Sequence, residues 1–290
     1  MSFKDFTANI RSTREYKEVV LEEAKLQDIK TYLDVINNIV GREKGFSFVL
    51  LENGAEVAKA LEGVGGYSGL MIKSPHYIGL SITIEGAETE FTSAYYMQGT
   101  VKKLYDMGLG SCWIGTRGIP QELKAALLQG QGGNLNYLLA FGLAEDKAKS
   151  HMAVINDAAS YKQDPYGTKV VESSATEDVR LSLGEMVYLY DWGKGAGYED
   201  LERRGVADIF FFVRNAPSYK NMQPCRIILK DGEADLAVVN PENIENYVDA
   251  GIMMYTLEGL AKDMGIPCKW SFVQDAAGNK EYGIAAKIEL

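Results

Sequence analysis

The chain has 290 residues, of which 46% are hydrophobic and 24% charged, and it carries a formal net charge of −10. This composition is that of a globular protein with a sizeable core, and the negative charge argues against binding to nucleic acid or to an anionic membrane surface. No apolar stretch suits a signal peptide or a membrane span, so we expect a cytoplasmic protein. Three cysteines without a Cys-x-x-Cys pair and two histidines without a surrounding motif predict neither a disulfide framework nor a metal site.

Hydrophobic periodicity predicts a mixed order of helices and strands. In the N-terminal part the expected elements are helix 15–38, strand 46–52, helix 54–62, strand 76–84, helix 90–107 and strand 135–144. In the C-terminal part they are helix 199–215, strands 225–231 and 235–240, helix 242–264, and strands 268–273 and 281–289. The segment from about 150 to 178 is the expected connection. Strands mixed with long helices, without strict β–α–β repetition, predict an α+β sandwich.

Two parts of the chain resemble each other. Asp106-Met107-Gly108-Leu109 is echoed by Asp263-Met264-Gly265-Ile266, and each follows a predicted helix. Trp113 and Trp270 occupy corresponding positions after these segments. Self-similarity of this kind indicates an internal duplication. The chain is therefore predicted to consist of two similar halves, residues 1–165 and 166–290.

Three short segments carry most of the functional information in the sequence. They are Arg11-Ser12-Thr13-Arg14, the stretch from Gly108 to Gly115, and Pro217-Ser218-Tyr219-Lys220-Asn221-Met222-Gln223-Pro224. Together they resemble the FMN-binding segments of the nitroreductase family, in the fused, single-chain form of the Thermotoga-type nitroreductases. Members of the family are normally homodimers that hold each FMN at the subunit interface. The resemblance therefore implies a nitroreductase-like α+β sandwich whose two halves form a pseudo-dimer within one chain, which can be a monomer.

The resemblance also assigns roles to the first segment. A guanidinium group suits the phosphate of FMN, so Arg11 is expected at the phosphate. Ser12 is expected at the ribityl chain, and Arg14 at the N1/O2 edge of the flavin ring, where a positive charge favours the anionic reduced form. Ile10 stands where the family usually has a further arginine.

The other segments complete the expected site. Pro217, Ser218 and Asn221 are predicted to contact the ring or the ribityl chain from the second half. Ile114 and Gly115 are the positions predicted to offer a backbone N–H to the flavin N5. Lys147 is a weaker additional candidate near the phosphate, because a solvated surface lysine explains it better.

A second flavin site is not expected, because the first half lacks its own copy of the Pro-Ser-x-x-Asn loop and the second half lacks its own copy of the Arg-Ser-x-Arg segment. Residues 39–43 stand where the first half would carry its own Pro-Ser-x-x-Asn loop, and the stretch around Tyr190 stands where the second half would carry Arg-Ser-x-Arg. Phe272 stands opposite Gly115 and would crowd a flavin. These losses all fall on the same site, so one FMN per chain is predicted.

The resulting expectation is an FMN-dependent oxidoreductase of the nitroreductase type. Electrons would pass from NADH or NADPH through the flavin to a small electron-poor acceptor, such as a nitroaromatic or a quinone. Since the flavin supplies the chemistry, no catalytic side chain is nominated. One alternative is a relative within the enzyme class that dehalogenates or desaturates a substrate, or that fragments the flavin itself. The others are a non-catalytic flavin- or small-ligand-binding protein on the same fold, and a structural remnant without flavin.

Overall fold

The computed structural model contains two compact units, each built around one main sheet. The four-stranded unit comprises Arg11–Ile84 and Leu104–Asp178, and the five-stranded unit comprises Met1–Ile10, Glu85–Lys103 and Val179–Leu290. The structure describes residues 2–66, 69–128, 130, 132–145, 152–155, 169–172, 180–275 and 281–290. Neither unit is one stretch of sequence. The predicted boundary between residues 165 and 166 falls outside the described residues and stays a prediction.

The four-stranded unit has an antiparallel sheet with the strand order β1-β2-β4-β3. Its strands are β1 (Phe46–Leu51), β2 (His76–Ile82), β3 (Gly110–Gly115) and β4 (Asn134–Gly142). Its helices are α2 (Glu23–Ile36), the π-helix η1 (Asn37–Gly41), α3 (Arg42–Lys44), α4 (Gly54–Ala60) and α6 (Gln121–Leu127). A separate two-stranded ribbon, within the predicted connection, pairs β5 (Met152–Ile155) with β6 (Lys169–Glu172).

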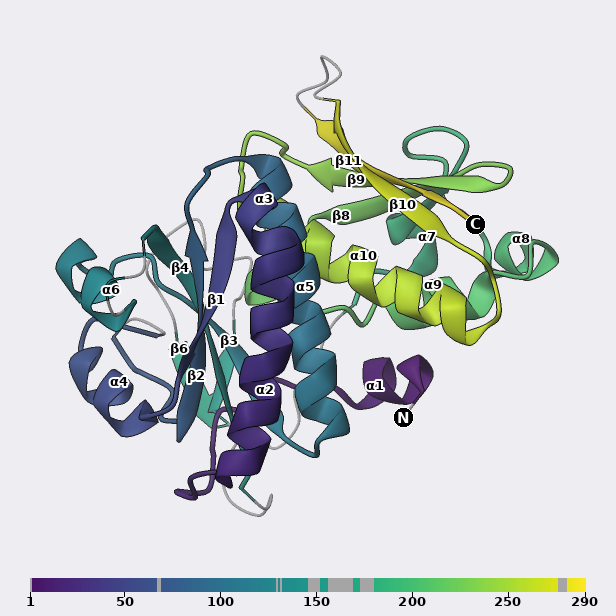
Figure 1. Cartoon of the computed structure of the whole chain (residues 1–290). Coiled ribbons are helices and arrows are strands. Elements are labelled where there is room, and N and C mark those ends of the chain that lie inside the picture. Colours follow the sequence, from purple (N-terminus) through teal and green to yellow (C-terminus); the bar gives the residue numbers. More distant parts are fainter. Residues whose placement is uncertain are drawn as a thin grey trace. The chain divides into compact units, whose positions relative to one another are not determined.

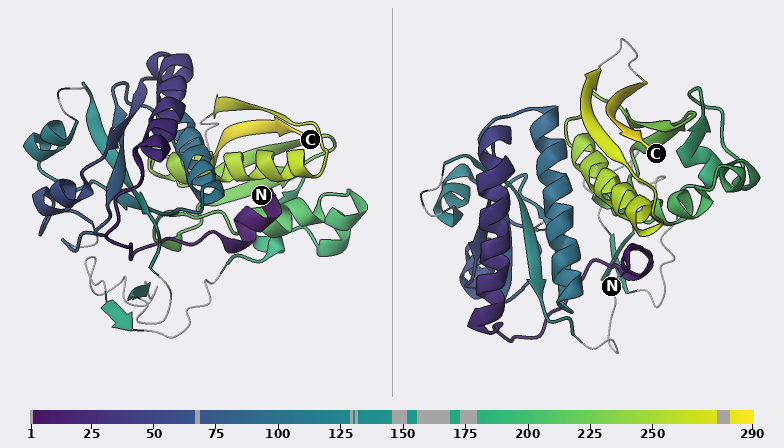
Figure 2. Two further views of the ribbon diagram at one scale, coloured as in Figure 1. Left: turned by 60° about the horizontal axis from the view of Figure 1, so that its bottom comes forward. Right: turned by 45° about the vertical axis from the view of Figure 1, so that its right-hand side comes forward.

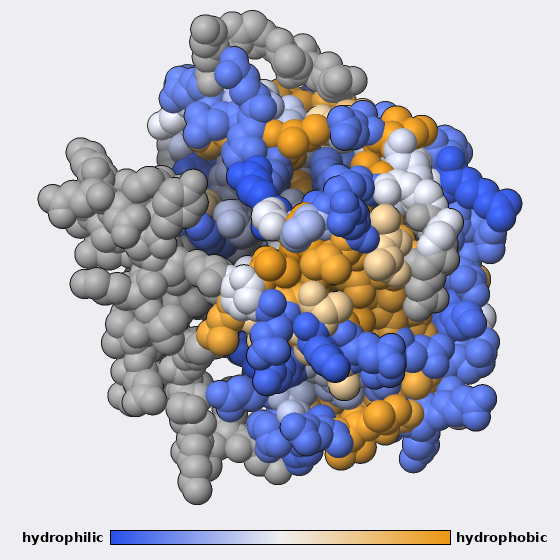
Figure 3. Space-filling model, turned by 90° about the vertical axis from the view of Figure 1, so that its left-hand side faces the viewer, coloured by the Kyte–Doolittle hydropathy of each residue, from blue (hydrophilic) through white to orange (hydrophobic). Residues whose placement is uncertain are grey.

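Helices cover both faces of this sheet. The buried side chains of α2, Leu26, Ile29, Leu33 and Ile36, recur every three or four residues and so share one helix face, which packs toward β1 (Figure 1). On the opposite face, a hydrophobic cluster joins residues of α4 and of the strands, and Leu123 and Leu127 of α6 pack against it. Figure 3 views the side on which α4 and α6 lie in Figure 1, and it shows hydrophobic side chains gathered among hydrophilic ones.

The π-helix protects the outer edge of the sheet. Strand β1 is an edge strand, whose unpaired backbone groups could pair with another chain. The side chain of Asn37, the first residue of η1, donates to the carbonyl oxygen of Phe48 (2.9 Å) and accepts from its N–H (2.7 Å). Its amide therefore occupies the hydrogen-bonding groups of Phe48 in the way that a neighbouring strand would.

The five-stranded unit has the strand order β10-β11-β9-β8-β7, antiparallel except for the β7–β8 pair. Its strands are β7 (Val187–Leu189), β8 (Cys225–Leu229), β9 (Glu233–Val239), β10 (Lys269–Asp275) and β11 (Tyr282–Glu289). Its helices are α1 (Phe3–Asn9), most of α5 (Ala87–Asp106), α7 (Leu183–Met186), α8 (Tyr198–Arg203), α9 (Ala207–Val213), the short 3-10 turn η3 (Tyr219–Asn221) and α10 (Asn246–Asp263).

Helix α10 is the central helix of the five-stranded unit and is buried along most of its length. It packs on β8 and β9 (Figure 2) and against α1 and α9. Two glycines permit close approach, since a Cβ at Gly251 would lie 2.1 Å from the carbonyl oxygen of Phe91 in α5, and a Cβ at Gly259 would meet the Phe3 ring of α1. Within the described residues, no helix combines the length and apolar character needed to cross a membrane.

The two sheets share one plan. The order β1-β2-β4-β3 in one unit corresponds to β8-β9-β11-β10 in the other, with the same antiparallel pairings. A long helix, α5 or α10, joins the second and third strands in chain order. Each of these helices is followed by a glycine in the left-handed conformation, Gly108 (φ 75°) and Gly265 (φ 71°), as is common at helix C-termini.

The predicted α+β class is confirmed, and two predicted helices need correction. Helix 15–38 begins only at Glu23, because the preceding residues are extended and bonded to the sheet: Lys17 N–H donates to Leu143 O (2.9 Å) and Leu21 N–H donates to Nε2 of His76 (3.0 Å). Helix 199–215 is two helices, α8 and α9, separated at Gly205, which has a φ of 72°.

Candidate functional site

The Arg-Ser-Thr-Arg segment lies beside β3 in the four-stranded unit. Ser12 forms a parallel bridge with Ser111, and the Thr13 N–H donates to the Ser111 carbonyl oxygen (2.9 Å). Gly110 permits this approach, because a Cβ there would lie 2.3 Å from Oγ1 of Thr13. The segment thus extends the sheet by a short stretch beyond its edge strand, with its N-terminal residues exposed to solvent.

The far end of β3 carries the two other predicted contacts of this unit. Ile114 points into the hydrophobic cluster and is 2% exposed, so only its backbone could face a ligand. Gly115 has open space around it, since a Cβ added there would meet no atom within 4 Å. Its φ lies outside the left-handed region, so neither packing nor backbone conformation in this chain requires a glycine at this position.

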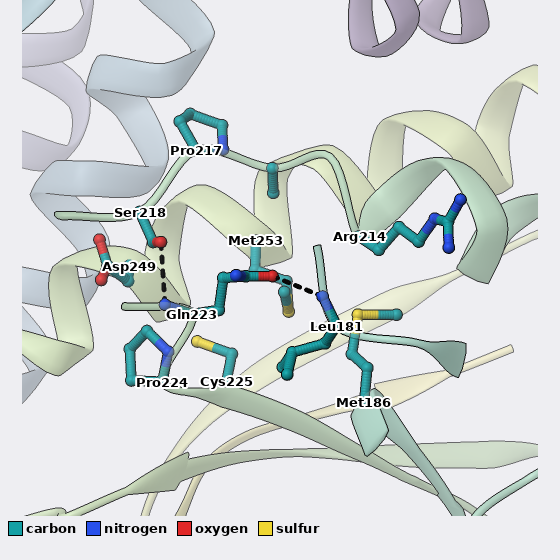
Figure 4. Close-up of a pocket in the computed structure, with 11 residues that line it drawn as sticks. Leu181, Met186, Arg214, Pro217, Ser218, Gln223, Pro224, Cys225, Asp249 and Met253 are labelled. Atoms are coloured by element: carbon teal, nitrogen blue, oxygen red, sulfur yellow. Dashed lines mark hydrogen bonds between the residues drawn. The ribbon is translucent and has the colours of Figure 1, made fainter. Parts of the chain in front are cut away.

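The Pro217–Pro224 loop of the five-stranded unit connects α9 to β8 and is held by its own polar groups (Figure 4). Ser218 Oγ accepts the Gln223 N–H (3.0 Å), and the Ser218 carbonyl oxygen accepts the Asn221 N–H (3.1 Å). Three residues of the loop adopt the left-handed conformation that non-glycine residues seldom adopt, namely Lys220 (φ 49°), Asn221 (φ 56°) and Gln223 (φ 47°). The loop is therefore a specifically folded structure that presents exposed residues at its tip.

Two contacts tie this loop to the segment that precedes α7. Gln223 Oε1 accepts the Leu181 N–H (2.9 Å; Figure 4). Arg180 donates to the carbonyl oxygen of Ala216 (3.1 Å) and to the side-chain oxygen of Asn221 (3.1 Å). Because a guanidinium group can only donate, its bond fixes which end of the Asn221 amide is the oxygen.

A cavity of about 10 Å³ lies beneath the loop, between β8 and α10. This space could hold one water molecule at most and is far too small for a cofactor. Among its lining groups are the carboxyl group of Asp249 and the thiol of Cys225 (Figure 4). Burial raises the pKa of Asp249 to about 7, against the opposing effect of a hydrogen bond from the Tyr219 amide. Burial also raises the pKa of the Cys225 thiol, which favours its unreactive, protonated form.

The predicted site residues fall into two groups. Ser12, with Arg11 and Arg14 close to it in the sequence, lies beside Ser111 near the start of β3, and Ile114 and Gly115 lie at the other end of that strand, all in the four-stranded unit. Pro217, Ser218 and Asn221 lie together in the loop of the five-stranded unit. Lys147 lies outside the described residues. That both groups contact one ligand remains a prediction.

Three residues that shape the loop were not predicted from the sequence: Arg180, Gln223 as a partner of Leu181, and Asp249. One signal for Asp249 was present. It is an acid within the otherwise largely apolar stretch Tyr247–Met254, and such a residue in a buried helix usually has a specific role. No comparable local signal marks Arg180.

The N-terminal part of the chain, which includes the Arg11–Arg14 segment and β3, matches a known family of proteins. Residues 7–176, more than half of the chain, match the family model described as "Putative TM nitroreductase". The chain belongs to this nitroreductase family, and the family supports an oxidoreductase activity.

Several solved structures are similar to all or part of this chain. The crystal structure of a putative nitroreductase from Thermotoga maritima is 15% identical and superimposes with a TM-score of 0.59, covering 100% of this chain and 93% of that one, which shows a shared fold. An FMN-dependent nitroreductase from Clostridium difficile is 21% identical, with a TM-score of 0.39 and coverage of 55% and 95%. A nitroreductase family protein from Clostridium novyi NT is 18% identical, with a TM-score of 0.40 and coverage of 51% and 90%. Comparison with curated protein sequences finds no match.

Proposed function

We propose that the protein is an FMN-dependent oxidoreductase that passes electrons from NADH or NADPH to an electron-poor acceptor, a nitroaromatic or a quinone. The observation that carries this proposal is the open backbone at Gly115, at one end of a strand that is bridged near its other end by Ser12 of the Arg11–Arg14 segment. A flat aromatic ring can approach a strand closely only where no side chain intervenes, and this chain has no internal need for glycine there.

The neighbouring groups fit the parts of FMN. Arg11 is exposed and can offer a guanidinium fork to a phosphate, while Ser12 beside it can bond a hydroxylated chain. Arg14, partly buried, provides a positive charge suited to the ring edge. When bound, the flavin supplies the electron-transfer chemistry, and these residues bind and orient it.

The loop of the five-stranded unit is proposed as the second part of the same site. Pro217 gives the loop its extended entry, and Ser218 and Asn221 are placed at its tip by the bonds described above. The side chain of Asn221, whose oxygen accepts from Arg180, is proposed as a polar contact of the ligand.

We further infer that the two units arose by internal duplication and form a pseudo-dimer with one flavin site. The shared strand order supports the duplication. Gly115 follows Trp113 by two residues in β3, and Phe272 follows Trp270 by two residues in β10. The Phe272 ring packs on Phe91 (5.4 Å between centroids), so an aromatic side chain occupies the place where Gly115 leaves space.

The two units also differ in the connection that leads from a helix into the first strand of the shared plan, and this difference again leaves one unit without a feature of the proposed site. In the five-stranded unit, α9 leads into β8 through the Pro217–Pro224 loop. In the four-stranded unit, α2 continues through η1 and α3 directly to β1 and so forms no comparable loop. Both differences support a single site per chain.

Titration with FMN and turnover measurements test the proposal. Apo-protein should bind FMN with a saturating ratio of one per chain, develop flavin absorbance, lose it on anaerobic addition of NADH or NADPH, and recover it with a nitroaromatic or quinone. A ratio of two would contradict the single site. Binding without reduction would favour a flavin-binding protein without turnover, and a protein that stays colourless would refute the flavin assignment.

A further inference from the structure

Helix α10 carries two buried acids with different surroundings. Glu258 accepts hydrogen bonds from Tyr95 Oη, Lys262 Nζ and Trp270 Nε1, the last at 2.9 Å. Asp249, 5% exposed, accepts from one donor among the described residues: the Tyr219 N–H lies 3.0 Å from one carboxyl oxygen and 3.2 Å from the other. Asp249 therefore lacks the donors that a buried carboxylate needs to replace water.

Tyr219 links the Pro217–Pro224 loop to helix α10 next to the two residues with left-handed backbone conformation. It is the first residue of η3 and precedes Lys220 and Asn221, both in the left-handed conformation. Left-handed non-glycine residues persist only where surrounding contacts hold them. The Asp249–Tyr219 bond is such a contact, and it joins the loop tip to a helix 30 residues further along the chain.

We propose that Asp249 is a positioning residue for the Ala216–Pro224 loop, which it holds in the observed form when its carboxyl group is neutral and releases when the group ionises. A neutral carboxyl group accepts the Tyr219 N–H and needs little hydration. An anion in the same place, beside Cys225 and Met253, needs more water than the single molecule that the cavity can hold, and it gains this water only if the loop lifts. The consequence for flavin binding rests on the proposed function, whereas the loop movement itself does not.

The charged groups in the region of Asp249 act on its pKa in both directions. Glu245 on the same helix adds a negative charge that raises the pKa of Asp249 further, beyond the larger effect of burial. Cys225 of β8 and Arg214 line the same cavity, Arg226 lies close to Cys225, and Lys220 belongs to the loop. A positive charge from any of these basic residues favours the ionised form of Asp249, so burial has to outweigh it. Helix α5, which approaches α10 at Gly251, carries Glu88 and Glu90 in its first turn. Because the pKa of Asp249 is about 7, opening releases a proton at pH values between the ordinary aspartate pKa and about 7.

Amide hydrogen exchange at Tyr219 tests the proposal on the full chain. After correction for the intrinsic rate, exchange in the native protein should rise by up to about tenfold per pH unit from pH 5 to 7 and level off above pH 7. Asp249→Asn keeps an acceptor oxygen but cannot ionise, so its corrected exchange should be independent of pH. Glu245→Gln should shift the levelling-off to lower pH, and Asp208→Asn, an exposed acid paired with Lys4, should leave the profile unchanged.

Two results would overturn the assignment: a pH-independent corrected rate in the native protein, or the same pH profile in Asp249→Asn. The native profile is informative even if the variant does not fold. A separate arm adds FMN at pH 6, where the proposed site predicts slower exchange at Tyr219. Absence of that slowing alongside the expected pH profile would count against the flavin site and would uphold the role of Asp249.

Discussion

Replacing Gly115 should affect folding and flavin binding in opposite directions. In the free protein a Cβ at Gly115 meets no atom within 4 Å and the backbone is not left-handed, so Gly115→Ala should fold normally. Removing the conformational freedom of glycine from the unfolded chain should stabilise the protein by about 0.4–1 kcal/mol. If a flavin ring lies against this backbone, the added methyl group must displace it, at a cost of about 1–3 kcal/mol, typical of overpacking. The FMN dissociation constant should then rise roughly 5- to 150-fold, and further for Gly115→Val.

The assay pairs chemical denaturation with fluorescence titration of FMN. Gly132 provides a matched control, since a Cβ there also meets no atom within 4 Å and its φ is likewise outside the left-handed region. Gly132→Val should leave FMN affinity unchanged. Unchanged FMN affinity in Gly115→Val, with a normally folded protein, would refute the placement of the ring at β3.

Three further outcomes are expected. Arg11→Ala should weaken FMN binding by about 1.5–3 kcal/mol and riboflavin binding much less, because riboflavin lacks the phosphate; equal losses in the two titrations would exclude a phosphate contact. Burial lowers the pKa of His76, whose neutral ring accepts the Leu21 N–H. The contribution of His76 to stability should therefore be present above about pH 6.5 and be lost as the pH falls toward the lowered pKa of the folded state, by at most about 1.4 kcal/mol per pH unit. Denaturation curves at pH 7.5 and 5 should show this loss in the native protein and a smaller one in His76→Asn. Asn37→Ala should destabilise the chain by about 1–3 kcal/mol and increase association through β1 in light scattering, whereas a monodisperse variant would show that Asn37 does not protect this edge.

Local sequence patterns were sufficient for most elements. The strand predicted at 46–52 and the helix predicted at 242–264 match β1 and α10 to within a few residues, since apolar runs and Asn-Gly or Met-Gly ends mark them. The predicted start of α2 was wrong because hydrogen bonds to distant parts of the chain determine where this helix begins. The residues before Glu23 are held in an extended form by Leu143 and His76, which lie far away in the sequence.

The candidate site, too, was predicted in part from local sequence patterns and depends in part on contacts between distant residues. Pro217 and the amide residues after it predict a loop at the correct place, and Arg11–Arg14 is found beside the segment with which it was grouped. The left-handed run at Lys220 and Asn221 and its dependence on Asp249 could not be derived, because that bond arises only when α10 packs beneath the loop.

The way in which the chain supplies its five-stranded unit has a consequence for synthesis on the ribosome. Helix α1 is made before its partners, since Phe3 packs at Gly259 and Lys4 pairs with Asp208, both of which are translated much later. Helix α5 likewise emerges long before the helix that it meets at Gly251. The nascent protein must therefore leave the contacts of α1 and α5 with α10 unformed until α10 leaves the exit tunnel. A fragment that begins after α5 would lack both α1 and α5, so the C-terminal region is not expected to fold when it is expressed alone.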